Sequence, residues 1–271
     1  MSQDVAASGR MEIRDLSITY RKPKSDEIFT AVDRVSLTIE KGSFVTIVGS
    51  SGCGKSTLLL AMAGLIPRAS GSITLGGVDV TKPGPDRAMV FQDASLLPWR
   101  TVHGNVRFAL ELQRWKRDDI DERALRYVRM VGLGAFADYH PHQLSGGMRQ
   151  RVNIARALCV DPDVLLMDEP FGALDAQTRE VMCDELLRIW ERDKKTAIFV
   201  THAIDEAIFL GDRVVVMGRN PGHVREVIEI DLPRPRTSAM LDSPAFVAYR
   251  RQLREYIAAD LLALQMVEAL V

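Results

Sequence analysis

Cysteines, long apolar runs and an excess of either charge are all scarce in this chain. Its 271 residues include three cysteines, Cys53, Cys159 and Cys183, which are widely spaced and form no Cys-x-x-Cys pair. Such a set argues against a disulfide framework or a zinc site and fits a reducing cytosol. No apolar run approaches the roughly 18 residues of a membrane span, and residues 1–9 lack the apolar core of a signal peptide. We therefore expect a cytosolic chain that could reach a membrane only through a partner.

A basic excess is also missing, since 35 Lys and Arg face 36 Asp and Glu for a formal net charge of -1. This balance argues against a general nucleic-acid binder. Arginines do gather near the end of the chain, but acidic residues interrupt them, so a solvated surface is the favoured interpretation. The arginines are Arg219, Arg225, Arg234 and Arg236, and the acids are Glu226, Glu229 and Asp231.

The chain is 46% hydrophobic, enough for one sizeable core with an inserted or appended lobe. Strands alternate with helices, which predicts a mostly parallel sheet covered on both faces. Expected strands are 11–20, 35–39, 43–48, 72–75, 87–91, 164–167, 197–200 and 214–217. Helices are expected at 58–63, in an all-helical insert from 101 to 131, and at 146–159, 176–192 and 243–271. Residues 21–27 are expected to form an exposed hairpin or loop.

The segment Gly49-Ser50-Ser51-Gly52-Cys53-Gly54-Lys55-Ser56-Thr57 lies between an apolar strand and a helix. It fits the phosphate-binding loop pattern of a glycine, four residues and then Gly-Lys-Ser. Glycines let backbone N–H groups approach phosphate oxygens, and the following helix adds the positive end of its dipole. Lys55 is predicted to reach the β- and γ-phosphates, and Ser56 to hold Mg²⁺. The chain therefore binds a nucleoside triphosphate on this interpretation.

A second signal is the apolar strand 164–167, which ends in Asp168 and Glu169. Carboxylates at the carboxyl end of a parallel strand lie where such sheets bind ligands. Asp168 is placed to hold Mg²⁺ through its water shell, and Glu169 to activate the attacking water. The alternative is that Asp168 and Glu169 form an acidic turn that only faces solvent. The presence of a phosphate-binding loop in the same chain makes this alternative less favoured.

A third signal is Leu144-Ser145-Gly146-Gly147-Met148-Arg149-Gln150-Arg151. Ser145 is predicted to cap a helix, and the two glycines leave its first N–H groups open to an anion. With this segment in place the chain resembles the ATP-binding subunit of ABC transporters over nearly its whole length. The motifs stand in family order: the phosphate loop, Gln92 of the Q-loop, the Leu-Ser-Gly-Gly signature, Asp168-Glu169, the D-loop Gly172-Ala173-Leu174-Asp175 and the switch histidine His202.

The resemblance implies an ABC ATPase fold: a RecA-like P-loop NTPase core with a mostly parallel sheet, an N-terminal antiparallel β region and an inserted helical subdomain. It places the core at 1–92 and 160–235, the helical subdomain with the signature at 93–159 and a helical extension at 236–271. Met148 and Gly172 depart from the commonest signature and D-loop. These departures leave Ser145, Gly146 and Gly147 intact.

The resemblance also implies roles for individual residues. Glu169 would be the general base, and His202, Lys55 and Gln92 would be further catalytic residues. ATP would be bound by Tyr20, Gly49, Ser50, Ser51, Gly52, Cys53, Gly54, Lys55, Ser56 and Thr57, and from a second subunit by Ser145, Gly146, Gly147 and Asp175. Mg²⁺ would be held by Ser56, Gln92 and Asp168. Phe29 stays an alternative to Tyr20 as the aromatic ring that stacks on adenine.

The segment Leu96-Leu97-Pro98-Trp99 resembles the nitrate, sulfonate and taurine importer subgroup, as do Asn220-Pro221-Gly222 and residues 232–236. This resemblance implies a second ATP-binding subunit, in a homodimer, and a transmembrane permease that docks near Leu97 and Trp99. It also implies an indirect link to a periplasmic substrate-binding protein, and it places this chain at the cytoplasmic face of the bacterial inner membrane. A self-packed loop tip is the alternative for Trp99. An ABC-type ATPase of DNA repair or iron–sulfur assembly is the alternative function.

Overall fold

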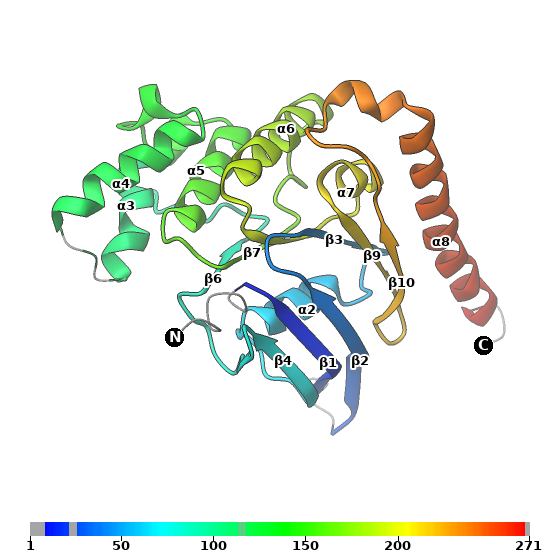
Figure 1. The fold of residues 1–271 in the computed structure, drawn as a ribbon. Helices are drawn as coiled ribbons and strands as arrows, with labels where there is room; N and C mark the ends of the chain where they lie inside the picture. Colours follow the sequence, from blue (N-terminus) through cyan, green and yellow to red (C-terminus); the bar gives the residue numbers. More distant parts are fainter. Residues whose placement is uncertain (1–8, 22–25, 114, 116, 269–271) are drawn as a thin grey trace. The chain divides into compact units, whose positions relative to one another are not determined.

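The computed structural model describes residues 9–21, 26–113, 115 and 117–268. The chain divides into two compact units, one with the residues up to Pro83 and from Thr196 on, the other with Gly84–Lys195. Figure 1 labels the elements of both. These units do not follow the functional division expected above, which stays a prediction. Most of the loop expected at 21–27 lies outside the described residues.

The first unit holds an antiparallel sheet in the order β2-β1-β4-β5. Its apolar side chains alternate, so that Ile13, Leu16 and Ile18 of β1 are buried. The second strand is longer than the predicted 35–39, because its first residues pair with β1 while their side chains stay exposed, which hides the apolar pattern. The strands are β1 (Met11–Arg21), β2 (Ile28–Ile39), β4 (Ser70–Leu75) and β5 (Val78–Asp79).

A second group of strands in this unit is mostly parallel. The strand β3 (Phe44–Gly49) pairs in parallel with β8 (Thr196–Val200) on one side and with β9 (Arg213–Gly218) on the other. Every residue of β3 and β8 is buried, as expected of central strands covered on both faces. The strand β10 (His223–Glu229) adds an antiparallel edge to β9.

The α-helices described in this unit are α2 (Lys55–Met62), α7 (Ile204–Leu210) and α8 (Pro244–Glu268), with a 3₁₀ turn at Ser238–Asp242. The predicted C-terminal helix is therefore present, and its Phe246 and Leu253 are buried. The side chains of residues 259–271 lie outside the described part. Helix α7 and strand β10 were not predicted. Within the described ranges, no helix combines the length and apolar character needed to cross a membrane.

The second unit contains the parallel pair β6 (Arg87–Val90) and β7 (Val164–Asp168) and a set of helices. The predicted insert forms two helices, which pack with the following signature helix around buried residues such as Val106, Leu110 and Val128. The helices are α3 (Val102–Leu112), α4 (Arg117–Met130), α5 (Gly146–Leu158) and α6 (Ala176–Asp193), with 3₁₀ turns at Gly134–Phe136 and Pro141–Gln143.

One prediction about the C-terminal arginines is wrong. Arg236 is only 5% exposed, and its guanidinium donates to main-chain oxygens of Ile208, Phe209 and Gly211. Arg234 is paired with Asp212 at 2.7 Å. These two side chains are therefore structural parts of the first unit rather than a solvated surface.

Candidate functional site

The phosphate-binding loop connects β3 to α2 as predicted. Gly52 and Gly54 adopt left-handed φ angles of 79° and 91°, which residues with a side chain rarely reach. A Cβ at Gly49 would meet the main-chain oxygen of Met217 at 2.5 Å, so this position needs glycine for close packing. Around Gly52 nothing lies within 4 Å of such a Cβ, which leaves that side of the loop open to a ligand.

Lys55 lies over this loop and is 5% exposed. Its Nζ donates to the main-chain oxygens of Gly49 at 2.8 Å and Ser50 at 3.2 Å. The ammonium is thus held within the loop that should receive phosphate. The Ser50 Oγ is enclosed and has no hydrogen-bond partner in the described part of the chain. A buried hydroxyl without a partner beside an ammonium suits a phosphate oxygen, so these residues fit ATP.

The two aromatic candidates for adenine stacking lie directly opposite each other. Tyr20 of β1 pairs with Phe29 of β2, and both are exposed. Since paired residues of antiparallel strands point to the same face, the rings form one aromatic surface. Strand β2 reaches the phosphate loop nearby, because a Cβ at Gly54 would meet Ala31 O at 3.0 Å. Two residues of strand, about 7 Å, separate Ala31 from Phe29.

His202 comes two residues after β8, and its side chain is exposed. The preceding Thr201 donates its main-chain N–H to Ile47 O of β3 at 3.1 Å. Because β3 continues into the phosphate loop, the switch histidine and the loop start from the same pair of neighbouring strands.

In the second unit, Asp168 ends β7 and Glu169 follows in a left-handed conformation with φ 43°. Such a φ is unusual for a glutamate and typical of strained functional positions, at a cost of about 1–3 kcal/mol. Gln92 comes two residues after β6, the parallel neighbour of β7. A Cβ at Gly172 would lie 3.2 Å from Gln92 Nε2 and 3.4 Å from Glu169 O. Gly172 therefore leaves room for the Gln92 amide, and three predicted motifs meet here.

The signature begins helix α5 as predicted. Ser145 is the exposed N-cap, and its Oγ accepts from Met148 N at 3.3 Å. A Cβ at Gly147 would meet Thr178 Cγ2 at 3.0 Å, so the signature lies against helix α6. Asp175 caps that helix by accepting from Thr178 N at 2.9 Å and Thr178 Oγ1 at 2.7 Å. These hydrogen bonds lower the pKa of the Asp175 carboxyl.

Helix α5 also holds the Q-loop, through residues that the sequence analysis did not single out. Gln150 and Asn153 both donate to Phe91 O at 3.3 Å, and the Arg156 guanidinium donates to Ala94 O at 2.8 Å and Ser95 O at 3.1 Å. Their spacing of three residues along a helix was the available signal. The signature helix thus fixes the backbone on both sides of Gln92.

The segment carrying Leu97 and Trp99 is fixed by hydrogen bonds to the side chain of Asn105. This fully buried amide accepts from Leu97 N at 2.8 Å and donates to Leu97 O, Arg100 O and Thr101 O. Leu97 is half-buried, whereas Trp99 is 71% exposed. A tryptophan left that exposed on a firmly hydrogen-bonded turn is unusual, because its large apolar surface is not used within this chain.

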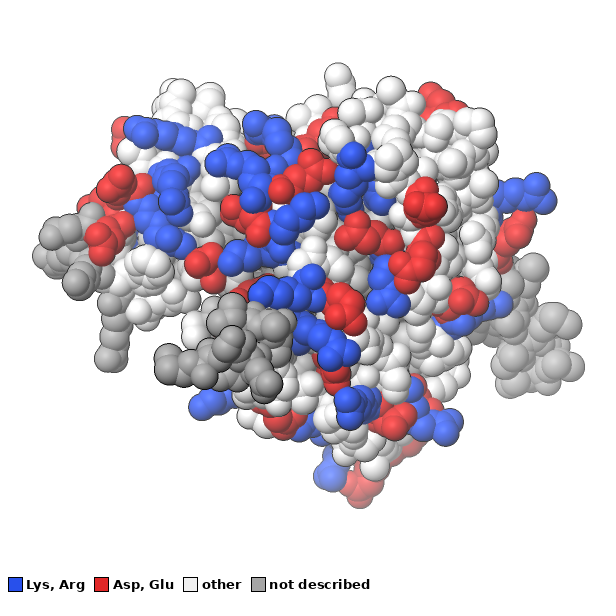
Figure 2. All heavy atoms as spheres, in the orientation of Figure 1, with Lys and Arg blue, Asp and Glu red and all other residues white. Residues whose placement is uncertain are grey.

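The charge distribution shows no dominant sign on the face drawn in Figure 2, where Lys and Arg side chains are mixed with Asp and Glu. No group of three or more His, Cys, Asp or Glu side chains in the described part could hold a metal ion by itself. The hydroxyl of Ser56 and the carboxylate of Asp168 are oxygen donors of the kind that Mg²⁺ prefers.

A phosphate loop before helix α2, an acidic end on β7 and a helix-capping Ser-Gly-Gly together define a P-loop nucleoside triphosphatase. The ABC transporter family matches residues 32–172. An uncharacterized ABC transporter ATP-binding protein of Methanocaldococcus jannaschii is 48% identical over 232 residues, 86% of each chain. The chain belongs to the ABC transporter family as an ATP-binding cassette, and it is an ABC-type ATPase.

Other relatives carry more specific names. The taurine import ATP-binding protein TauB of Rhizobium johnstonii is 49% identical over 229 residues, 83% of this chain and 87% of its own. The bicarbonate transport ATP-binding protein CmpD of Synechocystis is 42% identical over 263 residues, 96% and 91% of the two chains. A dimeric bacterial ABC transporter cassette of solved structure is 33% identical with a TM-score of 0.72, over 82% of this chain and 100% of its own. The predicted fold class is thereby confirmed.

Proposed function

We propose that this chain is the ATPase subunit of an importer for a small anion such as taurine, an aliphatic sulfonate or nitrate. The observation that carries the proposal is the set of relatives named for import or transport of taurine, nitrate and bicarbonate, at 49%, 46% and 42% identity. Taurine, nitrate and bicarbonate are small molecules that present negatively charged oxygens. The substrate would bind elsewhere, to a periplasmic protein and a permease.

In the proposed cycle two copies of the chain close around ATP. Lys55 of one copy contacts the γ-phosphate from the phosphate loop, and Ser145 and Gly147 of the other copy contact it from the signature. The capped N-terminus of α5 supports this role, because its first N–H groups favour an anion. Solved relatives that form dimers support the pairing. Hydrolysis removes the shared contact, so the pair opens.

In this proposal, residues of this chain carry out the hydrolysis of the γ-phosphate. Glu169 takes a proton from the attacking water, a role typically worth 10²- to 10⁴-fold in rate. His202 contacts the γ-phosphate and helps to fix the geometry of attack. Gln92, Ser56 and Asp168 supply the oxygens for Mg²⁺, whose charge, when bound, would neutralise phosphate oxygens. The bent backbone at Glu169 and its nearness to Gln92 support this assignment.

Coupling to transport is assigned to the turn bearing Leu97 and Trp99. A permease helix that covers Trp99 would bury an apolar ring on a turn that Asn105 already holds in place. Pre-ordering lowers the entropy cost of docking. The Q-loop is joined to the signature helix by Gln150, Asn153 and Arg156, so a push on this turn would reach both Gln92 and Ser145.

The test is purification of the tagged chain from gently solubilised native membranes. We expect a multi-helix permease to remain bound to the wild type and to be lost from Trp99→Glu. Val78→Glu is the matched control, because Val78 is an apolar residue with the same 71% exposure in the other compact unit. Recovery of the wild type with DNA-repair or iron–sulfur assembly proteins instead of membrane chains would contradict the transporter assignment. If a permease is recovered, the substrate is identified by measuring the uptake of labelled taurine, nitrate and sulfonate in cells that lack the gene. The compound whose uptake is lost is the substrate.

A further inference from the structure

The residues around His202 contain a hydrogen-bonded clamp that none of the predicted motifs includes. Thr201 Oγ1 donates to Glu206 Oε2 at 2.5 Å and accepts from Ala203 N at 3.0 Å. The hydroxyl therefore uses both its proton and a lone pair, one residue before and one residue after the histidine. Thr201 and Glu206 are buried, at 3% and 8% exposure, whereas His202 itself is exposed.

The clamp fixes the backbone on both sides of His202. Helix α7 begins just after it, and its N-cap, Ala203, has no side chain that could cap the helix. The Thr201 hydroxyl instead accepts from the main-chain N–H of Ala203 itself. A carboxylate in the first turn, here Glu206, is also favoured by the helix dipole.

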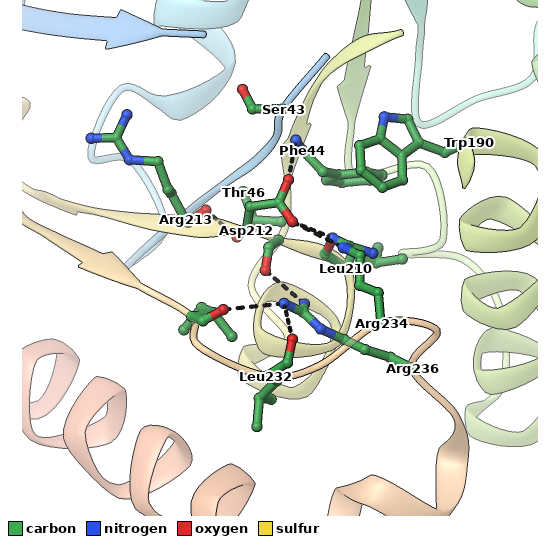
Figure 3. Close-up of polar contacts among 12 residues, drawn as sticks. Ser43, Phe44, Thr46, Trp190, Leu210, Asp212, Arg213, Leu232, Arg234 and Arg236 are labelled. Carbon is green, nitrogen blue, oxygen red and sulfur yellow. Dashed lines mark hydrogen bonds and ion pairs between the residues drawn. The ribbon is translucent and has the colours of Figure 1, made fainter. Parts of the chain in front are cut away.

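Helix α7 is in turn attached to β3, the strand that leads to the phosphate loop. Thr46 Oγ1 of β3 donates to Ala207 O at 3.1 Å, one residue beyond Glu206. Figure 3 shows Thr46 near the C-terminal end of α7, where Arg234 and Arg236 point at main-chain oxygens. The carboxylate of Glu206 is thus carried on a helix that is fixed along its length relative to β3.

We propose that Glu206 and Thr201 are positioning residues for ATP hydrolysis, which act by fixing the main chain on both sides of His202. The inference rests on the proposed role of His202 at the γ-phosphate. Misplacing a contact by about 1 Å can cost up to roughly 100-fold in rate. The hydrogen bonds of the clamp join Thr201 to Glu206 and Ala203 rather than to the phosphate loop, so we expect the binding of ATP not to depend on it.

The test compares Thr201→Val with Thr201→Ser in the full-length chain. Valine keeps the shape of threonine but removes the hydroxyl, whereas serine keeps the hydroxyl. We expect kcat for ATP hydrolysis to fall by about tenfold or more in Thr201→Val, with the Kd for ATP within about twofold of wild type. Thr201→Ser should stay within about threefold in kcat. Equal kcat in wild type and Thr201→Val would overturn the proposal.

Asp205→Asn is the matched control on the same helix. Asp205 is exposed and pairs with Arg250 of α8 at 2.6 Å, so its loss disturbs α7 without touching either neighbour of His202. We expect its kcat to equal that of the wild type. If Asp205→Asn lowers kcat as much as Thr201→Val does, the effect is a general loosening of α7 and the proposal fails. Should Thr201→Val not fold, Glu206→Gln, with an expected several-fold loss of kcat, decides in the same way.

His202→Ala separates this inference from the proposed function. If His202→Ala hydrolyses ATP like the wild type, the role of His202 is wrong, and the positioning proposal falls with it. If His202→Ala loses turnover while Thr201→Val and Glu206→Gln keep it, the role of His202 stands and only the clamp is refuted. In a double variant, Thr201→Val should add no further loss to His202→Ala, because both act through the same side chain.

Discussion

Replacing Arg236 by methionine is expected to destabilise the first unit strongly. The guanidinium donates to Ile208 O at 2.8 Å, Phe209 O at 3.1 Å and Gly211 O at 2.7 Å, all at the end of helix α7. Two longer bonds reach Ile230 O and Leu232 O. The last carbonyls of a helix have no partner within the helix, so Arg236 satisfies groups that would otherwise be buried and unpaired. Figure 3 shows the Arg236 side chain and its bond to Leu232 O.

The size of the effect follows from the three short bonds. A buried acceptor that loses its partner costs about 1–3 kcal/mol. Two effects reduce this cost: water can enter the space left by the guanidinium, and the variant no longer has to bury a charge. We therefore use the lower end of the range for each carbonyl. Three carbonyls at about 1 kcal/mol each give about 3 kcal/mol. For a chain of this size that corresponds to a fall in Tm of about 6–12 °C.

The assay is thermal and urea unfolding at neutral pH, followed by circular dichroism. Arg251→Met is the control, since Arg251 pairs with Glu255 at 3.0 Å on the surface with its side chain 83% exposed. Exposed pairs contribute little, so this variant should lie within about 0.5 kcal/mol of wild type. A loss below about 1 kcal/mol for Arg236→Met would refute the reasoning, because the α7 carbonyls would then not depend on the guanidinium.

Two further predictions concern the nucleotide. Glu169→Gln should abolish ATP turnover while leaving ATP binding intact, measured by phosphate release and by equilibrium binding; turnover like the wild type's would remove Glu169 from the role of base. Tyr20→Ala should raise the KM for ATP by about tenfold, since stacking a base on an aromatic ring is worth about 1–3 kcal/mol, and Phe29→Ala should raise it less. A larger effect in Phe29→Ala would reverse the order of the two rings, and no effect in either would exclude the aromatic surface from binding.

The local structure of several predicted motifs could be predicted because it is encoded in short segments. The phosphate loop needs left-handed glycines, and Gly52 and Gly54 supply them where the motif requires. Ser145 caps α5 because its side chain reaches an N–H three residues later. Buried strands such as β3 could be read from continuous apolar runs. In each case the interaction joins residues that are neighbours in sequence.

Elements with a weaker local pattern were missed. Helix α7 is 7 residues long and mostly buried, so it shows no polar face from which a helical period could be read. The first part of β2 carries exposed side chains, and its pairing with β1 is what makes it a strand. Gln150 and Asn153 were passed over because buried polar residues on a helix become meaningful only once their partner, Phe91 O, is placed.

Arg236 shows most clearly why the rest could not be predicted. Arginines among acidic residues usually form a solvated surface. The pairing of Arg234 with Asp212, 22 residues earlier, is still an attraction between opposite charges. The three shortest bonds of Arg236, however, go to main-chain oxygens 25 to 28 residues earlier. Every residue has such an oxygen, so the sequence carries no mark of which ones a helix end leaves unpaired in the interior. A charged side chain can be buried there because several carbonyl dipoles replace its water. The segment after β10 thus completes the helix that carries Glu206, so a stretch without any nucleotide motif stabilises the helix that follows His202.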